Sequence, residues 1–239
     1  MEIPPARDSR FLFRIMASLR NLIKRIANPI LKTGLKFYYR KPRTYKYKGI
    51  NVIVHPDVFP PHLTFSTKIL LDFIDTLDLK QKNVLELGCG SGIISLFANK
   101  KGANVIASDI NETALEYLQK ASVKNNLPIK CIHSNLFENL AKFSFDYIII
   151  NPPYYPKQPK NIKEQAWFCG EEFEYFERLF QQLPKYLSQN NSTYMILSQD
   201  CNFEIITSIA KKNQLNLSII EKRNIWNESN YIYGIEKII

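Results

Sequence analysis

The sequence is poor in the residues that build metal centres and disulfide frameworks. Its 239 residues include four cysteines and no CxxC pair. This scatter fits neither a structural zinc site nor a cross-linked secreted domain, and it favours a reducing compartment. The three histidines (His55, His62 and His133) show no metal-ligand spacing. We therefore expect no metal.

The sequence also lacks a long uncharged apolar run, an internal repeat and a low-complexity segment. Because about 20 consecutive apolar residues are needed to cross a bilayer, no transmembrane segment is expected. No secretory signal is present, so the expected location is the cytoplasm. Hydrophobic residues make up 45% of the chain and charged residues 23%, as in soluble globular proteins. The length suits one sizeable α/β domain with a small appendage.

Acidic residues are missing from one stretch near the start of the chain. Residues 9–56 contain twelve Lys or Arg and no Asp or Glu, whereas residues 57–239 contain 19 basic and 20 acidic side chains. Apolar residues recur at helical spacing from Phe11 to Ile30, which predicts a helix that Pro29 kinks or ends. We assign residues 1–48 to a basic helical N-terminal extension, with Met16 as an alternative start.

Three roles are open for this extension. Cations and aromatic residues alternate in "FYYRKPRTYKYK" (37–48), as in segments that follow a phosphate backbone. Such a segment would contact nucleic acid or the ribosome. A basic, acid-free helix also suits a membrane surface or a targeting peptide. The third alternative is packing against the main domain.

From about residue 50, strand-like and helix-like segments alternate. This order predicts an α/β fold with a doubly wound, mostly parallel sheet in residues 49–239. The expected strands are 50–55, 83–88, 104–109, 129–135, 145–150, 193–198, 215–220 and 231–239. The expected helices are 66–77, with Ser66 or Thr67 as N-cap, 92–100, 112–126, 174–187 and 203–212.

A glycine-rich turn follows the strand at 83–88. In "ELGCGSG" (86–92), the three glycines leave no Cβ between the backbone and a ligand. Their spacing is GxGxG and not the GxGxxG of dinucleotide sites, because Ile93 occupies the last position. No Lys-Ser/Thr pair follows, which excludes a P-loop. The turn therefore favours a cofactor without a pyrophosphate.

Polar residues end the next three strands. Asp109 lies 21 residues after Gly88, where an acid accepts hydrogen bonds from ribose hydroxyls. Asn135 is placed to accept from an adenine amino group. Asn151 ends the apolar strand "FDYIII" and begins "NPPYY" (151–155). Because proline cannot donate to a sheet ladder, the strand must stop there.

The stretch after this strand suits a planar NH2 group whose nitrogen lone pair is delocalised. The Asn151 side-chain oxygen and the Pro152 carbonyl would accept its two N–H bonds and hold the nitrogen in one orientation. Pro152 and Pro153 fix the backbone, and Tyr154 would stack on the flat group. No general base is needed. The alternative is a proline-rich turn that only ends a strand.

Together the four motifs resemble the class I S-adenosylmethionine (SAM)-dependent methyltransferases over roughly residues 62–177. The resemblance implies a Rossmann-like seven-stranded sheet with an antiparallel last strand, and SAM as cofactor. It implies a catalytic role for Asn151, Pro152 and Tyr154. The implied cofactor-binding residues are Thr67, Glu86, Gly88, Cys89, Gly90, Gly92, Asp109, Ile110, Asn135, Leu136 and Asn151.

The "NPPY" form is similar to N-methyltransferases, above all the release-factor glutamine methyltransferases. Thr67, Ala166 and Gly170 match that family, whereas Cys169 and Phe173 stand where glycines are usual. The favoured acceptor is therefore a glutamine amide in a release-factor-like or ribosomal protein. The first alternative is an exocyclic amine of adenine or guanine in RNA or DNA. The second is a SAM-binding protein with a small-molecule or non-enzymatic role.

Overall fold

The computed structural model describes residues 40–62, 64–141, 143–225 and 228–238. The helix predicted between Phe11 and Ile30 lies outside these residues. The chain divides into residues 1–41 and a compact unit, Pro42–Ile239, which alone is described below. Within the described residues, no helix combines the length and the apolar character that a membrane crossing requires.

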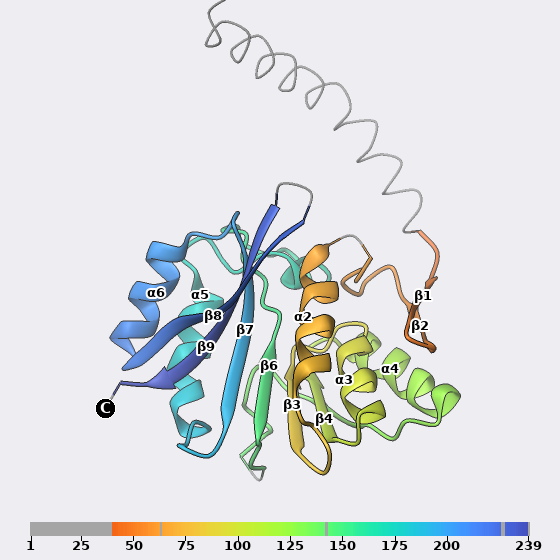
Figure 1. Ribbon diagram of the computed structural model, residues 1–239. Coiled ribbons are helices and arrows are strands. Elements are labelled where there is room, and N and C mark those ends of the chain that lie inside the picture. Colours follow the sequence, from red (N-terminus) through yellow and green to blue (C-terminus); the bar gives the residue numbers. More distant parts are fainter. Residues whose placement is uncertain (1–39, 63, 142, 226–227, 239) are drawn as a thin grey trace, which may run out of the picture. The chain divides into compact units, whose positions relative to one another are not determined.

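A seven-stranded sheet forms the centre of this unit (Figure 1). Its spatial order is β5-β4-β3-β6-β7-β9-β8. The first five strands in this order are parallel, and β9 is antiparallel to both of its neighbours. The predicted doubly wound sheet with an antiparallel last strand is thus confirmed. The strands are β3 (Asn83–Leu87), β4 (Asn104–Asp109), β5 (Lys130–His133), β6 (Tyr147–Ile150), β7 (Ser192–Ser198), β8 (Leu215–Ile225) and β9 (Glu228–Lys237).

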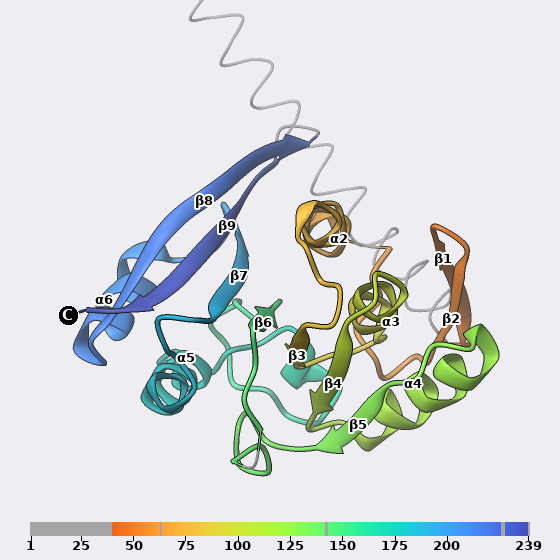
Figure 2. The ribbon, with the colours of Figure 1, turned by 60° about the horizontal axis from the view of Figure 1, so that its bottom comes forward.

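Helices cover both faces of the sheet (Figure 2). One face carries α2 (Phe65–Thr76), α3 (Ile93–Lys100) and α4 (Glu112–Asn125). The other carries α5 (Glu174–Gln182) and α6 (Phe203–Lys212), with short 3₁₀ turns at η1 (Glu164–Ala166) and η2 (Leu183–Lys185). The strand order reverses between β3 and β6. In open α/β sheets, such a switch point is where ligands bind, beyond the carboxyl ends of the strands.

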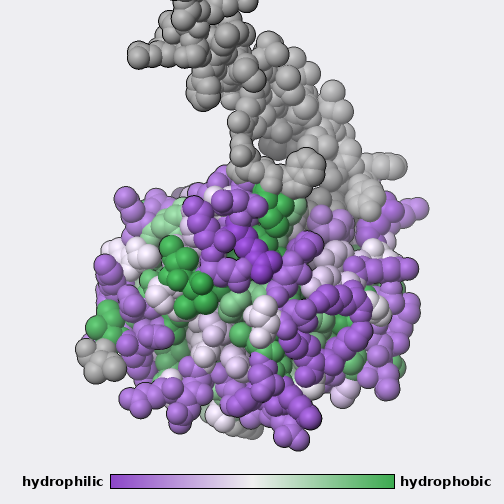
Figure 3. Space-filling view, viewed as in Figure 1, coloured by the Kyte–Doolittle hydropathy of each residue, from purple (hydrophilic) through white to green (hydrophobic). Residues whose placement is uncertain are grey.

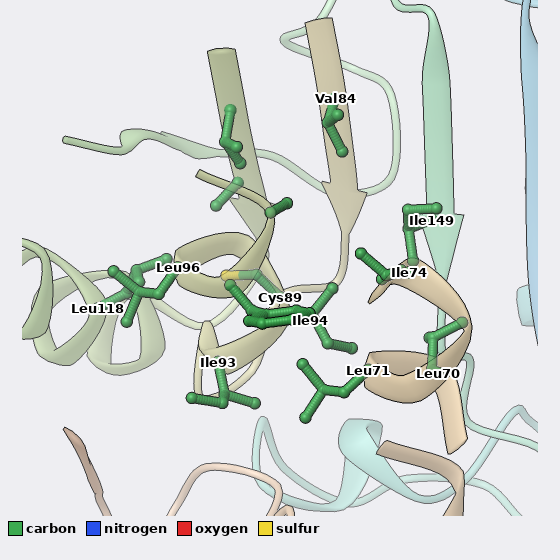
Figure 4. Close-up of a cluster of buried hydrophobic side chains, with 14 of the residues drawn as sticks. Leu70, Leu71, Ile74, Val84, Cys89, Ile93, Ile94, Leu96, Leu118 and Ile149 are labelled. Atoms are coloured by element: carbon green, nitrogen blue, oxygen red, sulfur yellow. The ribbon is translucent and has the colours of Figure 1, made fainter. Parts of the chain in front are cut away.

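Alternate residues of the central strands supply two separate cores. Val84 of β3 and Ile149 of β6 point toward α2 and α3, while Leu85 and Ile148 point toward α5 and α6. Figure 4 shows the first core, in which Leu70, Leu71 and Ile74 of α2 meet Ile93 and Ile94 of α3. Because both faces are buried, these strands read as continuous apolar runs, as expected of a parallel sheet.

A small antiparallel hairpin precedes the main sheet and corrects one prediction. Residues 43–47, assigned to the helical extension, form strand β1 (Arg43–Tyr47), which pairs with β2 (Ile50–Val54). Arg43, Tyr45 and Tyr47 are half-buried, and Thr44 and Lys46 are exposed, which is the two-residue period of a strand. Lys48 and Gly49 have φ of 42° and 82°, as the tight hairpin turn requires.

Several element boundaries also differ from the predictions, and three of these differences are informative. Thr64, not Ser66 or Thr67, is the N-cap of α2, and both of those residues are buried inside the helix. The helix predicted over 174–187 ends at Gln182, because Pro184 lacks the N–H that an α-helix needs at that point. Strand β8 runs five residues further than predicted, to Ile225.

Strand β8 forms one edge of the sheet and carries exposed apolar side chains. Ile219 and Ile220 are 57% and 51% exposed, beside an irregularity in the pairing between β8 and β9. Figure 3 shows apolar surface over strands β8 and β9, on a face that is otherwise mostly hydrophilic. Ile220 is the extra residue at this irregularity. An extra residue of this kind increases the local twist of an edge strand and discourages its pairing with other strands.

Candidate functional site

A cavity of 430 Å³ lies beyond the carboxyl ends of β3, β4 and β6. It is walled by the glycine loop, by the residues that follow β4 and β5, by 151–155, and by two further segments, 58–59 and 158–170. The predicted site residues that line it are Thr67, Glu86, Gly88, Cys89, Gly90, Asp109, Ile110, Asn135, Leu136, Asn151, Pro152 and Tyr154. The structure therefore brings together residues that are separated by more than eighty positions in the sequence.

The three glycines of the loop have different roles. All have positive φ (73°, 49° and 69° at Gly88, Gly90 and Gly92), a region that other residues enter at a cost. A Cβ built on Gly88 would contact nothing within 4 Å, so this position leaves open space for a ligand. A Cβ on Gly92 would lie 2.3 Å from Leu118 Cδ1. Gly92 does not line the cavity, and its lack of a side chain leaves room for Leu118 of α4 beside the start of α3.

Asp109 fixes the glycine loop from the end of β4. Its Oδ2 accepts a hydrogen bond from the Gly90 N–H at 2.7 Å, and its Oδ1 accepts one from the Asn111 N–H at 2.8 Å. Burial raises the pKa of this carboxyl, and the backbone N–H groups act in the opposite direction. Each carboxylate oxygen has a further lone pair, so Asp109 can hold the loop and still accept from a ligand hydroxyl.

Glu86 is a buried carboxyl in the wall of the same cavity. It is 5% exposed, and its Oε2 accepts hydrogen bonds from the Ser95 N–H at 2.8 Å and from the Ser95 hydroxyl. Desolvation raises the pKa of Glu86 to about 8 in spite of these two bonds. A cation placed in the cavity would therefore favour the ionised form of Glu86.

The chain after β6 is pinned along its backbone. The Tyr155 N–H donates to the Trp167 carbonyl at 3.1 Å, and the Cys169 N–H donates to the Tyr155 carbonyl at 3.0 Å. The rings of Tyr154 and Tyr155 lie 4.8 Å apart and are tilted by 50°. Burial raises the pKa of Tyr154, so its phenol stays neutral. Asn151, half-buried, thus stands on a rigid segment at the cavity wall.

The loop after β5 forms the opposite wall. The Asn135 amide donates from Nδ2 to Glu138 Oε1 at 3.0 Å, which orients its carboxamide. Leu136 is 8% exposed and has φ of 52°, an uncommon backbone for an apolar residue. Such backbones cluster at ligand sites, where the surrounding structure enforces them. In this loop the predicted adenine contact, Asn135, and an apolar surface for a ring lie side by side.

Several lining residues were missed by the sequence analysis. Phe59 and Trp167 contact each other with ring centroids 4.7 Å apart. Tyr175 and Arg178 reach the cavity from α5, and Ser108 is buried with no hydrogen-bond partner for its hydroxyl. Two signals were available: Phe59 directly precedes Pro60 and Pro61, and Trp167 directly follows Ala166, one of the residues that carry the resemblance to release-factor methyltransferases. In the part of the chain that the structure describes, no three His, Cys, Asp or Glu side chains gather to hold a metal.

Known proteins are similar to this chain in sequence. Residues 49–213 match the family described as "Methyltransferase small domain". A relative from Methanocaldococcus jannaschii, described as a candidate protein N5-glutamine methyltransferase, is 33% identical over 157 residues, covering 63% of this chain and 77% of the relative. The Haemophilus influenzae ribosomal RNA small subunit methyltransferase C is 30% identical over 183 residues, covering 72% of this chain and 54% of the relative. This chain therefore spans about half of that second relative.

Solved structures share the fold. A Pyrococcus furiosus methyltransferase superposes with a TM-score of 0.61 at 18% identity, covering 90% of this chain and 100% of that one. The E. cuniculi Mtq2-Trm112 complex, described as methylating the eRF1 translation termination factor, gives 0.58 at 22% identity, with 76% and 99% covered. The T. thermophilus 16S rRNA N2 G1207 methyltransferase, bound to AdoMet and guanosine, gives 0.58 at 17%, with 82% and 50% covered.

Proposed function

This chain belongs to the methyltransferase small domain family, and we propose that it methylates the side-chain amide of a glutamine in a protein. It is a SAM-dependent methyltransferase. The proposal concerns the acceptor, the residues that hold it and the residues that hold the cofactor.

The cavity suits SAM on three observations. Gly88 leaves space against the backbone, Asp109 has unused lone pairs, and Glu86 uses only Oε2 for its two bonds to Ser95. We assign the ribose hydroxyls to Asp109, the methionine part to the glycine loop and Glu86, and the adenine to Asn135 and Leu136. When bound, SAM supplies a methyl group on a positively charged sulfur.

The observation that carries the acceptor assignment is the neutral lining beside Asn151. The segment after the tyrosines, up to Gly170, contributes only uncharged residues to the cavity, namely Gln158, Pro159, Ile162, Gln165, Ala166, Trp167, Phe168, Cys169 and Gly170. An uncharged amide enters such a slot without leaving an unpaired charge. The Asn151 side-chain oxygen and the Pro152 carbonyl accept its two N–H bonds and orient the nitrogen toward the methyl. Catalysis then rests on orientation and on acceptors that favour the transition state.

A second candidate acceptor is the exocyclic amine of guanine or adenine in RNA or DNA. The Haemophilus relative acts on ribosomal RNA by its name and matches more of this chain, 183 residues against 157. Tyr154 and Tyr155 offer aromatic faces on which a base stacks. Such a base would use the same two acceptors at Asn151 and Pro152.

A labelled-methyl experiment separates these acceptors. The protein is incubated with SAM carrying a labelled methyl and a cell extract, which is then fractionated into protein and RNA. We expect label in protein, recovered as N5-methylglutamine after digestion and mass spectrometry. Label in RNA on a guanine or adenine amine supports the second candidate. Label on lysine or arginine, or none in any fraction, contradicts both.

A further inference from the structure

Two aromatic side chains from distant parts of the chain meet in the lining of the cavity. Phe59 comes from the connection between β2 and α2, and Trp167 from the connection between β6 and α5. Their ring centroids are 4.7 Å apart, and the rings are tilted by 50°. Both are half-buried and both line the cavity. We call this contact the aromatic roof.

The roof is fastened to both sides of the site. A Cβ on Gly90 would lie 3.8 Å from Phe59 Cβ, so Phe59 rests against the glycine loop. Trp167 accepts the hydrogen bond from the Tyr155 N–H, which ties it to the segment that begins with Asn151. The roof therefore contacts the glycine loop, which we assign to the cofactor, and the segment after Asn151, which we assign to the acceptor. The transferred methyl passes from the first to the second.

Hydrogen bonds hold the Phe59 segment in place. The Asn111 amide donates from Nδ2 to the Asp57 carbonyl at 2.9 Å, and Asn111 is 8% exposed. The Asp57 carboxylate also lies 3.5 Å from Lys163 Nζ on the Trp167 side. Both partners of that ion pair are half-exposed, so it adds little stability. The position of the Phe59 segment is therefore set mainly by the hydrogen bond from the buried Asn111 amide and by the contact between the Phe59 and Trp167 rings.

The charges in the cavity favour a cation. The described lining residues include three carboxyls, those of Glu86, Asp109 and Glu174, and one guanidinium, that of Arg178. Arg178 is itself 3.6 Å from the carboxylate of Glu138. Aromatic faces attract cations through the negative charge above the ring, most strongly in tryptophan. A positive group beneath the roof meets π faces and carboxyls together.

We propose that Phe59 and Trp167 recognise the positive charge of the SAM sulfonium and so distinguish SAM from its neutral product, S-adenosylhomocysteine. The roof then helps retain the reactive cofactor and release the product, whose thioether sulfur carries no charge. This inference rests on the cofactor assignment in the proposed function and is independent of the acceptor.

The experiment compares ligands that differ in charge at one position. Binding of SAM, of sinefungin (an amine-bearing cation of similar shape) and of S-adenosylhomocysteine is measured by calorimetry for the wild type, Trp167→Leu and Phe59→Leu. We expect the leucine variants to lose about three- to tenfold affinity for the two cations, the usual range of a cation–π contact. Affinity for S-adenosylhomocysteine should stay within about twofold. Trp167→Phe should fall between the wild type and Trp167→Leu.

Tyr117→Leu is the matched control. Tyr117 is a half-buried aromatic of α4 that contacts His55 on the same connecting segment at 5.1 Å, but it does not line the cavity. Tyr117→Leu should not lower the affinity for any one of the three ligands more than for the others. Equal losses for all three ligands in the roof variants would overturn the inference and show a purely steric role. If the wild type binds none of the three, the cofactor assignment itself fails.

Discussion

At the scale of single residues, Asp109 and Asn151 face one cavity from the two strands that flank β3. Asp109 accepts one backbone N–H from Gly90 of the glycine loop and one from Asn111, whereas Asn151 follows a strand and leads into two prolines. Their positions imply that cofactor binding and methyl transfer are separable by substitution.

The first prediction uses this separation. Asn151→Ala should abolish methyl transfer and leave the Kd for SAM within a few-fold of wild type, because the main partner of its side-chain oxygen is the substrate. Asp109→Asn should weaken SAM binding by about 1.5–3 kcal/mol, the usual worth of hydrogen bonds to a charged group. Calorimetry and a turnover assay measure the two effects. Full activity of Asn151→Ala would contradict the site assignment.

The second prediction concerns Glu86, whose folded-state pKa of about 8 lies above its ordinary 4.5. Its contribution to stability is fully present below pH 4.5 and is lost as the pH rises through about 8. The free energy of unfolding of the cofactor-free protein should therefore fall with pH in this window, more than in Glu86→Gln. Urea titrations at several pH values measure it. Parallel curves for the two proteins would show that the Glu86 carboxyl keeps its ordinary pKa.

The pH dependence of SAM binding tests the ionisation of Glu86 independently. If the SAM ammonium pairs with ionised Glu86, affinity should rise with pH up to about 8 in the wild type. Glu86→Gln serves as the control, because any titration of SAM itself affects both proteins equally. An identical pH profile in the two proteins would remove Glu86 from the cofactor site.

At the scale of elements, the turn between β3 and α3 combines packing and binding. Gly92 is the N-cap of α3 and lies against Leu118 of α4, while Gly88 at the end of β3 faces open cavity space. One short turn therefore packs against α4 at Gly92 and leaves the cavity wall bare at Gly88.

The third prediction contrasts these two glycines. Gly92→Ala should destabilise the fold by about 1–3 kcal/mol, because the new methyl overlaps Leu118 in a packed core. Gly88→Ala should cost only the positive-φ strain, about 1 kcal/mol, but should weaken SAM binding by filling ligand space. Urea unfolding and calorimetry give both numbers for each variant. The reverse ranking would show that Gly92, and not Gly88, meets the cofactor.

The elements also show how far sequence reasoning reaches. Buried parallel strands are continuous apolar runs, so β3, β4 and β6 could be predicted from residues alone. The strand β1 was missed because its alternating tyrosines and lysines were interpreted as a nucleic-acid-binding segment. Phe59 and Trp167 were missed because their contact joins two connections that only the folded sheet brings together. Gly92 was predicted to bind the cofactor because it belongs to the glycine motif. Its packing role follows only from the nearby side chain of Leu118, which the sequence pattern does not show.

At the scale of the whole molecule, charge is distributed unevenly between the extension and the fold. Residues 57–239 are nearly neutral, and the basic excess lies in residues 9–56. The structure does not describe residues 1–39, so their predicted contact with nucleic acid or the ribosome stays a prediction.

The fourth prediction tests that contact. If the extension binds a phosphate backbone, affinity for RNA should fall steeply between 50 and 200 mM salt, by about a thousandfold if six or more phosphates are contacted. A variant lacking residues 1–39 should lose this binding and keep its affinity for SAM. Fluorescence anisotropy with a labelled RNA measures the RNA affinity of the full chain and of the truncated variant, and calorimetry measures their affinity for SAM. No binding at low salt would leave the extension without a nucleic-acid role.

The roofed cavity also limits how any partner presents its target. Asn151 lies in a hollow and not on an open face, so a macromolecule has to offer one protruding group while its bulk stays outside. A protein meets this demand with an extended loop that carries a long side chain. A folded nucleic acid has to unstack and extrude a nucleotide first, at a cost of a few kcal/mol. Single-stranded or already distorted sites would therefore outcompete paired ones.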